Sequence, residues 1–395
     1  MTRGIGMPVD VSAIDRELSE LWRSAADAHA SGELSAVVRA CLVNLIIWAP
    51  LERDAERLRE LAARLSLLVP ARVVHVRAER GAAEGDVASD DSGIRAWISA
   101  NCHLAPEGGK EICSEEVTIA ARGRAVDEMP SVVLTLLSPD VPTALLVTGP
   151  LPARVEDEPA LAKIAQTCDR LIVDSGRSSD AAYFERLAGI ARALPARGTL
   201  GDLAWRRLSP WRRAIADEFD GAFAGRARDI ENVIVEFVEG TASADAFAEG
   251  SAASGVPARL LLGWIASVLG WGGTEGALDG RVGVRAVRSG TSSAARDESP
   301  RTGGAVQAEV AGIAAVEFRF AADARGAESS LRIEAVDDLR ENVLRAVAGD
   351  APPRLARHGR ADEEHLLARE LRFLRGDRVY HEALALAARV PAARA

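Results

Sequence analysis

Two cysteines and a histidine in the segment 101–116 are the residues of this chain best suited to chemistry. Cys102 and Cys113 could form a reversible disulfide, and with His103 they could supply thiolate and imidazole ligands to a zinc ion. The same segment contains Lys110, one of two lysines in a chain with 46 arginines. A lysine among so many arginines suggests that this position needs a compact ammonium group, so Lys110 is a candidate for partner binding.

The turn inside this segment determines how the two cysteines are placed. The sequence Pro-Glu-Gly-Gly at 106–109 suits a tight β-hairpin turn, because Gly108 can adopt the positive φ that such turns require. With Glu107 and Gly108 as the loop residues, Cys102 lies directly opposite Cys113. Opposed strand residues have Cα atoms about 4.5–5.5 Å apart, within the range of a disulfide. A thiol–disulfide switch is therefore one interpretation, and two thiols buried as small hydrophobic groups is the other.

The alternation of side chains along the two strands argues against a metal site. One face is mostly apolar and ends with Cys102 and Cys113, so we expect both cysteines to point inward. His103 then points to the opposite, polar face and cannot join them as a ligand. The other cysteines, Cys41 and Cys168, lack the paired spacing of zinc ligands. We predict no metal site.

Tryptophan and arginine are concentrated in the segment 205–212, and this is the composition of an interaction hot spot. We predict that Trp205, Arg206, Trp211 and Arg212 contact a protein partner. The alternative is a hinge between domains, in which the tryptophans belong to the core and the arginines are solvated.

A weaker candidate for anion binding is the turn 174–180, where a strand ends and a helix begins with unpaired backbone N–H groups. Ser175, Arg177 and Ser179 could bind an anion there, although Ser179 or Asp180 acting as an ordinary helix N-cap explains the same pattern. The sequence contains no phosphate-binding loop, dinucleotide fingerprint, nucleophile elbow or His-Glu-x-x-His pair. We therefore predict a protein that is not an enzyme and needs no cofactor.

Composition excludes several classes of function. With 395 residues and 48% hydrophobic content, the chain is long enough for two or three domains. Its net charge is −10 and its arginines are interspersed with acidic residues, so we expect no nucleic-acid partner. No apolar run approaches the roughly 20 residues that span a bilayer, and the first residues lack a signal-peptide pattern. We expect a cytoplasmic protein without a membrane partner.

Alternating strands and helices must position these residues. The alternation through residues 1–220, together with the hairpin, predicts a layered α/β domain with a mixed sheet. Strand-like segments around an apolar helix predict a smaller α+β domain over residues 221–395. This domain contains residues 290–304, whose Ser, Arg, Asp and Pro content predicts a mobile loop. Two helices, at 362–374 and 377–390, complete it.

Several separated segments carry a family resemblance, namely residues 39–45, 102–116, 170–175, 201–212, 262–271 and 370–380. In this order, and over nearly the whole chain, they resemble the glucose-6-phosphate dehydrogenase assembly protein OpcA family. The hairpin and the segment 201–212 are the most specific matches. One departure is Val-Thr-Gly at 147–149, where the family tends to have tryptophan and arginine. If that position contacts the partner, the interface of this chain has diverged there.

The resemblance implies a non-catalytic assembly factor and allosteric activator. Such a protein binds glucose-6-phosphate dehydrogenase, promotes its active oligomer and sustains NADPH production in the oxidative pentose phosphate pathway. Redox sensitivity through cysteine occurs in some photosynthetic members, which would give Cys102 and Cys113 a regulatory role and make thioredoxin a partner. The alternative is a sugar-phosphate-binding protein or enzyme that uses the turn from Ser175 to Asp180.

Overall fold

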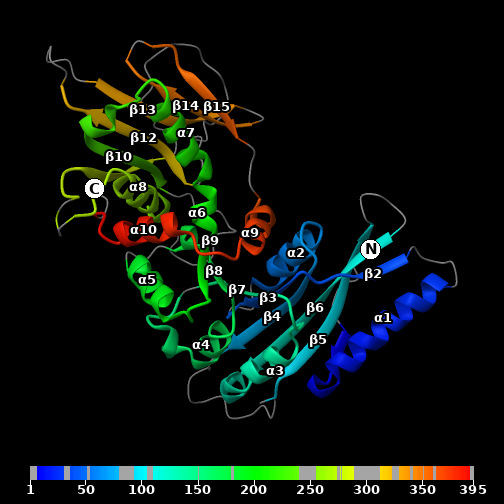
Figure 1. Cartoon of the computed structure of the whole chain (residues 1–395). Coiled ribbons are helices and arrows are strands. Elements are labelled where there is room, and N and C mark those ends of the chain that lie inside the picture. Colours follow the sequence, from blue (N-terminus) through cyan, green and yellow to red (C-terminus); the bar gives the residue numbers. More distant parts are fainter. Residues whose placement is uncertain are drawn as a thin grey trace. The chain divides into compact units, whose positions relative to one another are not determined.

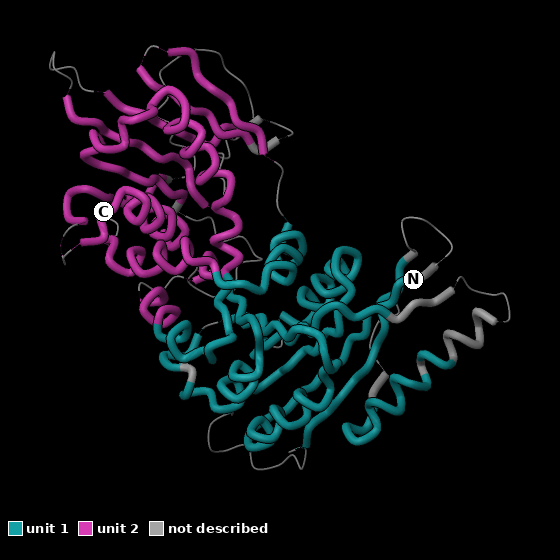
Figure 2. Tube along the Cα trace, in the orientation of Figure 1, with its two compact units in different colours: residues 1–173, 189–201, 362–376 teal, residues 174–188, 202–361, 377–395 magenta. Residues whose placement is uncertain are grey.

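A computed structural model arranges the chain in two compact units (Figures 1 and 2). Unit 1 comprises residues 1–173, 189–201 and 362–376, and unit 2 comprises residues 174–188, 202–361 and 377–395. Both units are built from several stretches of chain, which differs from the single boundary expected near residue 220. The described residues are 7–30, 36–50, 54–79, 93–104, 110–149, 151–178, 182–239, 255–273, 276, 278–288, 312–322, 329–338, 341–349, 351–358 and 362–391. The loop expected at 290–304 lies outside them.

The first sheet is mixed, and its strands follow the order β1-β5-β6-β4-β3-β7-β8-β9, with β2 also paired to β6. Strands β3, β4, β6, β7 and β8 form parallel pairs, whereas β5 is antiparallel to both β6 and β1. Every side chain of β3, β7 and β8 is buried, as expected for parallel strands covered on both faces. The strands are β1 (Met7–Val9), β2 (Ala36–Arg39), β3 (Val43–Trp48), β4 (Ala71–Glu79), β5 (Arg95–Leu104), β6 (Lys110–Arg122), β7 (Thr143–Val147), β8 (Arg170–Val173) and β9 (Thr199–Asp202). The expected α/β class with a mixed sheet is confirmed.

Helices cover both faces of this sheet. On one face, the indole of Trp22 in α1 (Ile14–Ala30) donates to the Glu115 carboxylate at 2.5 Å. Arg72 reaches the Leu136 carbonyl, just after α3 (Met129–Thr135), at 2.6 Å on the same face. On the other face, α2 (Ala55–Ser66) lies over β3 and β4 (Figure 1). Two further helices, α4 (Pro159–Ala165) and α5 (Tyr183–Ala193), follow β7 and β8.

A helix from the far end of the sequence completes unit 1. Helix α9 (Glu363–Arg372) packs against α2, and Glu363 pairs with Arg57 at 2.7 Å. Deeper in, Glu370 accepts from the Arg170 guanidinium of β8, and each of these side chains is 1% exposed. Gly201 lies against this pair, because a Cβ at that position would lie 2.8 Å from Arg170 Nε. The absent side chain thus makes room for a buried ion pair.

Unit 2 has the expected α+β character. Its sheet has the order β11-β10-β12-β13-β14-β15, in which only β10 and β11 pair in parallel. The strands are β10 (Ile230–Glu239), β11 (Val282–Arg288), β12 (Ile313–Phe320), β13 (Ser329–Asp338), β14 (Glu341–Val347) and β15 (Arg354–His358), and the helices are α6 (Leu203–Arg207), α7 (Ser209–Asp220), α8 (Val256–Val268) and α10 (Arg378–Ala387). Helices α8 and α10 touch closely at Gly263, where an added Cβ would lie 2.7 Å from the backbone nitrogen of Ala387. Among the described residues, no helix is both long and apolar enough to cross a lipid bilayer.

Candidate functional site

The hairpin of β5 and β6 has the register that the turn predicts. Cys102 pairs with Cys113, the two Cα atoms lie 4.1 Å apart, and the sulfur atoms form a disulfide. The turn itself, residues 105–109, lies outside the described residues. The pairing prediction is confirmed, and the redox role of the pair stays a prediction.

One detail of the hairpin was predicted wrongly. Cys113 is buried, but Cys102 is exposed although it shares the same face of the sheet. Cys113 lies between two paired strands, since Arg39 of β2 flanks it on the side away from Cys102. The described pairing of β1 with β5 ends at Ile98, so Cys102 lies on an edge of the described sheet. Strand alternation gives the face of a residue but not its distance from the edge.

The opposite face of the hairpin is polar and partly buried. His75 Nε2 lies 3.0 Å from one carboxylate oxygen of Glu116, and the Asn101 amide donates to the other at 2.7 Å. Burial alone would raise the pKa of Glu116, but the neighbouring His75 imidazole and the hydrogen bond from Asn101 outweigh burial and lower the pKa below its usual range. His103 is half-buried on this face, away from the cysteines. Lys110 begins β6 opposite Ala36, and its side chain lies outside the described part of the structure.

Both tryptophans of the segment 205–212 are buried. Trp205 is 1% exposed and Trp211 is 0% exposed. The Trp205 indole donates to the Asp377 carboxylate at 2.9 Å, and the Arg212 guanidinium carbon lies 3.5 Å from the Trp205 ring centre. Arg212 also donates to the Trp205 carbonyl at 3.1 Å. In this conformation the tryptophans form part of the core of unit 2, whereas Arg206 is half-exposed. The predicted contact with a partner stays a prediction, and the arginines are the residues able to make it directly.

Asp174 and Asp202, which were not predicted from the sequence, bind residues at the start of this segment through hydrogen bonds. Asp174 accepts from Arg207 at 2.6 and 2.8 Å and from Arg177 at 2.9 Å. Burial would raise the pKa of Asp174, but these two cations lower it. Asp202 caps α6 by accepting from Ala204 N at 2.9 Å, and burial raises its pKa to about 6 against the opposing bonds from Ser175 and Ala204. An Asp directly after a buried strand and an Asp directly before a helix are the sequence signals that could have indicated both.

These contacts occupy the proposed anion-binding turn. Arg177 is bound to Asp174, and the backbone N–H of Ser175 donates to Asp202 at 3.0 Å. Ser179 lies outside the described residues. Ser175 and Arg177 therefore bind carboxylates of this same chain, and these contacts do not support an anion site at this turn.

A small acidic group also approaches metal-ligand geometry. Asp362, Glu364 and His365 bring one ligand atom each within 4.8 Å of one another. Glu364 lies 3.3 Å from Arg64, and Asp362 and His365 are exposed. A surface cluster of this kind, with one member already paired, supports no metal site.

Comparison with known proteins adds the family. Residues 62–189 match the model described as glucose-6-phosphate dehydrogenase subunit N-terminal domain, and residues 199–384 match the corresponding C-terminal domain. A relative from Nostoc punctiforme, named OxPP cycle protein OpcA, is 23% identical over 67% of each chain. A second of the same name, from Synechococcus elongatus, is 26% identical over 46% of this chain and 37% of its own.

A similar solved structure is that of an oxidoreductase from Thermotoga maritima. It is 11% identical, covers 89% of this chain and 94% of its own, and has a TM-score of 0.39, too low to support an inference. The two family models instead match consecutive parts of the chain that together contain the hairpin and the segment 205–212. On this evidence the chain belongs to the OpcA family of glucose-6-phosphate dehydrogenase subunit proteins.

Proposed function

We propose that this protein is a non-catalytic assembly factor and allosteric activator of glucose-6-phosphate dehydrogenase. It binds the dehydrogenase in the cytoplasm, promotes the active oligomer and so supports the oxidative pentose phosphate pathway. The observation that carries this proposal is the match of both halves of the chain to models described as subunits of that enzyme. The absence of a catalytic motif from the sequence agrees with a helper that performs no chemistry itself.

The segment 205–212 supports a specific role for its arginines. Trp205 and Trp211 are fixed in the core, and the stacked guanidinium of Arg212 joins α6 to the start of α7. Arg206 lies on α6 and is half-exposed. The helix fixes the backbone beneath Arg206, and the planar guanidinium can form two parallel hydrogen bonds with a carboxylate of the partner.

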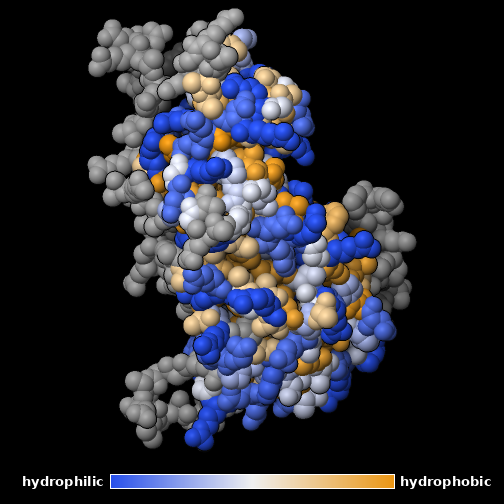
Figure 3. Space-filling view, turned by 60° about the vertical axis from the view of Figure 1, so that its left-hand side comes forward, coloured by the Kyte–Doolittle hydropathy of each residue, from blue (hydrophilic) through white to orange (hydrophobic). Residues whose placement is uncertain are grey.

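Unit 1 contributes apolar surface. Leu42, Leu67 and Phe373 are each at least 60% exposed. Their segments meet, because Leu42 N donates to the Pro70 carbonyl at 2.9 Å and Arg372 donates to the Leu68 carbonyl at 2.9 Å. Figure 3 shows one face of the molecule, which is largely hydrophilic and has smaller hydrophobic areas between the charged residues. Exposed apolar side chains gathered from three segments are typical of a protein-binding surface.

The experiment that tests the proposal is an assay of the cognate dehydrogenase with and without this protein. Addition should change its activity or substrate affinity and shift its mass in size-exclusion chromatography with light scattering. Arg206→Glu and Phe373→Ser should each weaken binding about tenfold or more, as interface anchors do. The matched control is Leu355→Ser, which removes a side chain that is 62% exposed in unit 2. Unchanged activity, affinity and oligomer size with the wild-type protein would exclude this function.

The Cys102–Cys113 disulfide is the candidate for redox control of this binding. A dithiol reductant such as thioredoxin would reduce the S–S bond to two thiols and become oxidised itself. The exposed position of Cys102 gives a reductant access to one of the two sulfur atoms. Reduction would break the covalent link between the two strands next to the turn. The backbone pairing of β5 with β6 would remain.

A further inference from the structure

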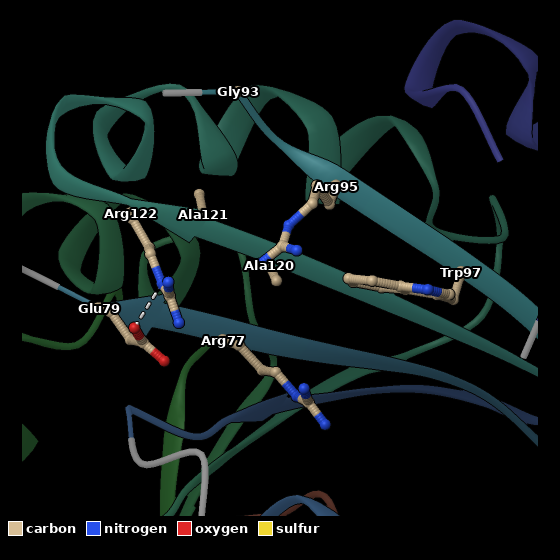
Figure 4. A pocket seen from close by; sticks show the side chains of 8 residues that line it. All are labelled: Arg77, Glu79, Gly93, Arg95, Trp97, Ala120, Ala121 and Arg122. Carbon is tan, nitrogen blue, oxygen red and sulfur yellow. Dashed lines mark ion pairs between the residues drawn. The ribbon is translucent and has the colours of Figure 1, made fainter. Parts of the chain in front are cut away.

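A hollow lies on the polar face of the first sheet, at the end of the paired strands β4 and β6 (Figure 4). These strands are parallel and end at Glu79 and Arg122, so the hollow lies at their carboxyl ends. Open α/β sheets characteristically bind ligands at this edge. The cavity has a volume of about 180 Å³, and its lining includes Arg77, Glu79, Arg95, Trp97, Ala120 and Arg122.

The strand register brings the charged side chains together. Arg77 of β4 and Arg95 of β5 both pair with Ala120, which lies between them on β6. The three positions share one face of the sheet, and the small side chain of Ala120 leaves the floor of the hollow open. Trp97, two residues after Arg95, forms a side wall, and the Arg95 guanidinium carbon lies 5.6 Å from its ring centre. Figure 4 shows these side chains around a common space.

The described lining is rich in guanidinium groups. Three arginines line the hollow beside one carboxylate, Glu79, which pairs with Arg122 at 2.7 Å. Arg77 and Arg95 also interact with other groups of the chain. Guanidinium groups match phosphate oxygens with paired, charge-assisted hydrogen bonds.

We propose that this pocket binds a small phosphorylated metabolite. Its phosphate would lie between Arg77 and Arg95, over Ala120, and its organic part would lie against the Trp97 ring. A hollow of about 180 Å³ has room for a phosphate group and the adjoining part of the ligand, since a cavity of about 150 Å³ accommodates a benzene ring. None of these residues belongs to the surfaces argued above to contact the dehydrogenase, so the proposal stands apart from that function.

Calorimetric titration of the full chain in phosphate-free buffer tests the site with three probes, namely inorganic phosphate, glucose 6-phosphate and glucose. We expect glucose 6-phosphate to bind more tightly than inorganic phosphate, and glucose not to bind. Arg95→Gln should lower the affinity for both anions about tenfold or more, because it removes a charge-assisted pair of hydrogen bonds. Trp97→Leu should weaken the binding of glucose 6-phosphate but not the binding of inorganic phosphate.

The control variant is Arg124→Gln, which removes an exposed arginine outside the pocket. If Arg95→Gln fails to fold by circular dichroism, Arg77→Gln tests the same contact from the neighbouring strand. The proposal is overturned if the wild-type protein binds neither anion at millimolar concentration. It is also overturned if Arg124→Gln weakens binding as much as the pocket variants, because attraction would then come from the general surface charge.

Discussion

The buried pair of Arg170 and Glu370 provides the sharpest test of how unit 1 is held together. Among the described residues, Glu370→Gln would leave the Arg170 guanidinium with neutral acceptors such as Thr199 Oγ1 at 3.0 Å and the Arg375 carbonyl at 3.2 Å. Both charged side chains are 1% exposed, so water cannot replace the lost carboxylate. Removing one partner of a buried ion pair costs about 3–5 kcal/mol. Because a domain is stable by only about 5–15 kcal/mol, we expect α9 to lose most of its attachment.

Two further variants separate charge from packing. Arg170→Met combined with Glu370→Leu removes both charges, and it should recover most of the stability because hydrophobic replacement of a buried pair is often neutral or favourable. Gly201→Ala should resemble Glu370→Gln, since its Cβ would lie 2.8 Å from both Arg170 Nε and Nη2. The control is Glu363→Gln, whose ion pair with Arg57 is 19% and 26% exposed and should contribute below about 1 kcal/mol.

The assay is urea unfolding combined with hydrogen–deuterium exchange of peptides from α9 and β8. Glu370→Gln should lower the unfolding midpoint and accelerate exchange in residues 363–372 before the rest of unit 1. A loss below about 1 kcal/mol would refute the reasoning, since it would place this pair among exposed ones. A double variant as unstable as Glu370→Gln would refute it as well, because unpaired charge would then not be the cause.

Three other outcomes are expected. Mass spectrometry of thiol-blocked protein should find Cys102 and Cys113 linked after mild oxidation and free after dithiothreitol, and dehydrogenase activation should differ between the two forms; equal activation would remove the redox role. Burial raises the pKa of Asp202 from 3.8 to about 6, so the stability from its bound proton is present below about pH 4 and lost as the pH rises through 6. Asp202→Asn should therefore show a flatter change of melting temperature between about pH 4 and 7 than the wild type, and parallel curves would contradict this. Gly263→Ala should separate α8 from α10 and destabilise the fold by on the order of 1–3 kcal/mol through overpacking; an unchanged melting temperature would show that the helices can shift without loss.

The sequence alone was sufficient where one local rule determined the outcome. The continuous apolar run before Pro50 is the pattern of a buried parallel strand, and it forms β3, whose side chains are all buried. The hairpin register followed from the turn, and Cys102 pairs with Cys113 accordingly. The alternation that predicted a mixed sheet in an α/β layer is also confirmed.

Contacts between distant parts of the chain could not be predicted in the same way. Composition made Trp205 and Trp211 resemble an exposed hot spot, but burial depends on Asp377 and other residues far along the chain. Periodicity predicted the helix now seen as α9 but not its docking, which depends on a pair 200 residues apart. The arginine pocket draws on β4, β5 and β6, and the parallel register of β4 with β6 has no local signal.

The two units alternate along the chain, and this limits how the gene can recombine. The backbone passes from one unit to the other five times, at residues 173, 188, 201, 361 and 376. A stop codon after residue 361 would remove α9 and α10 together, and so deprive Arg170 and Trp205 of their carboxylate partners in the two units at once. Neither unit can be duplicated, exchanged or lost by recombination of a single gene segment. We therefore expect the two units to have been transmitted as one indivisible module.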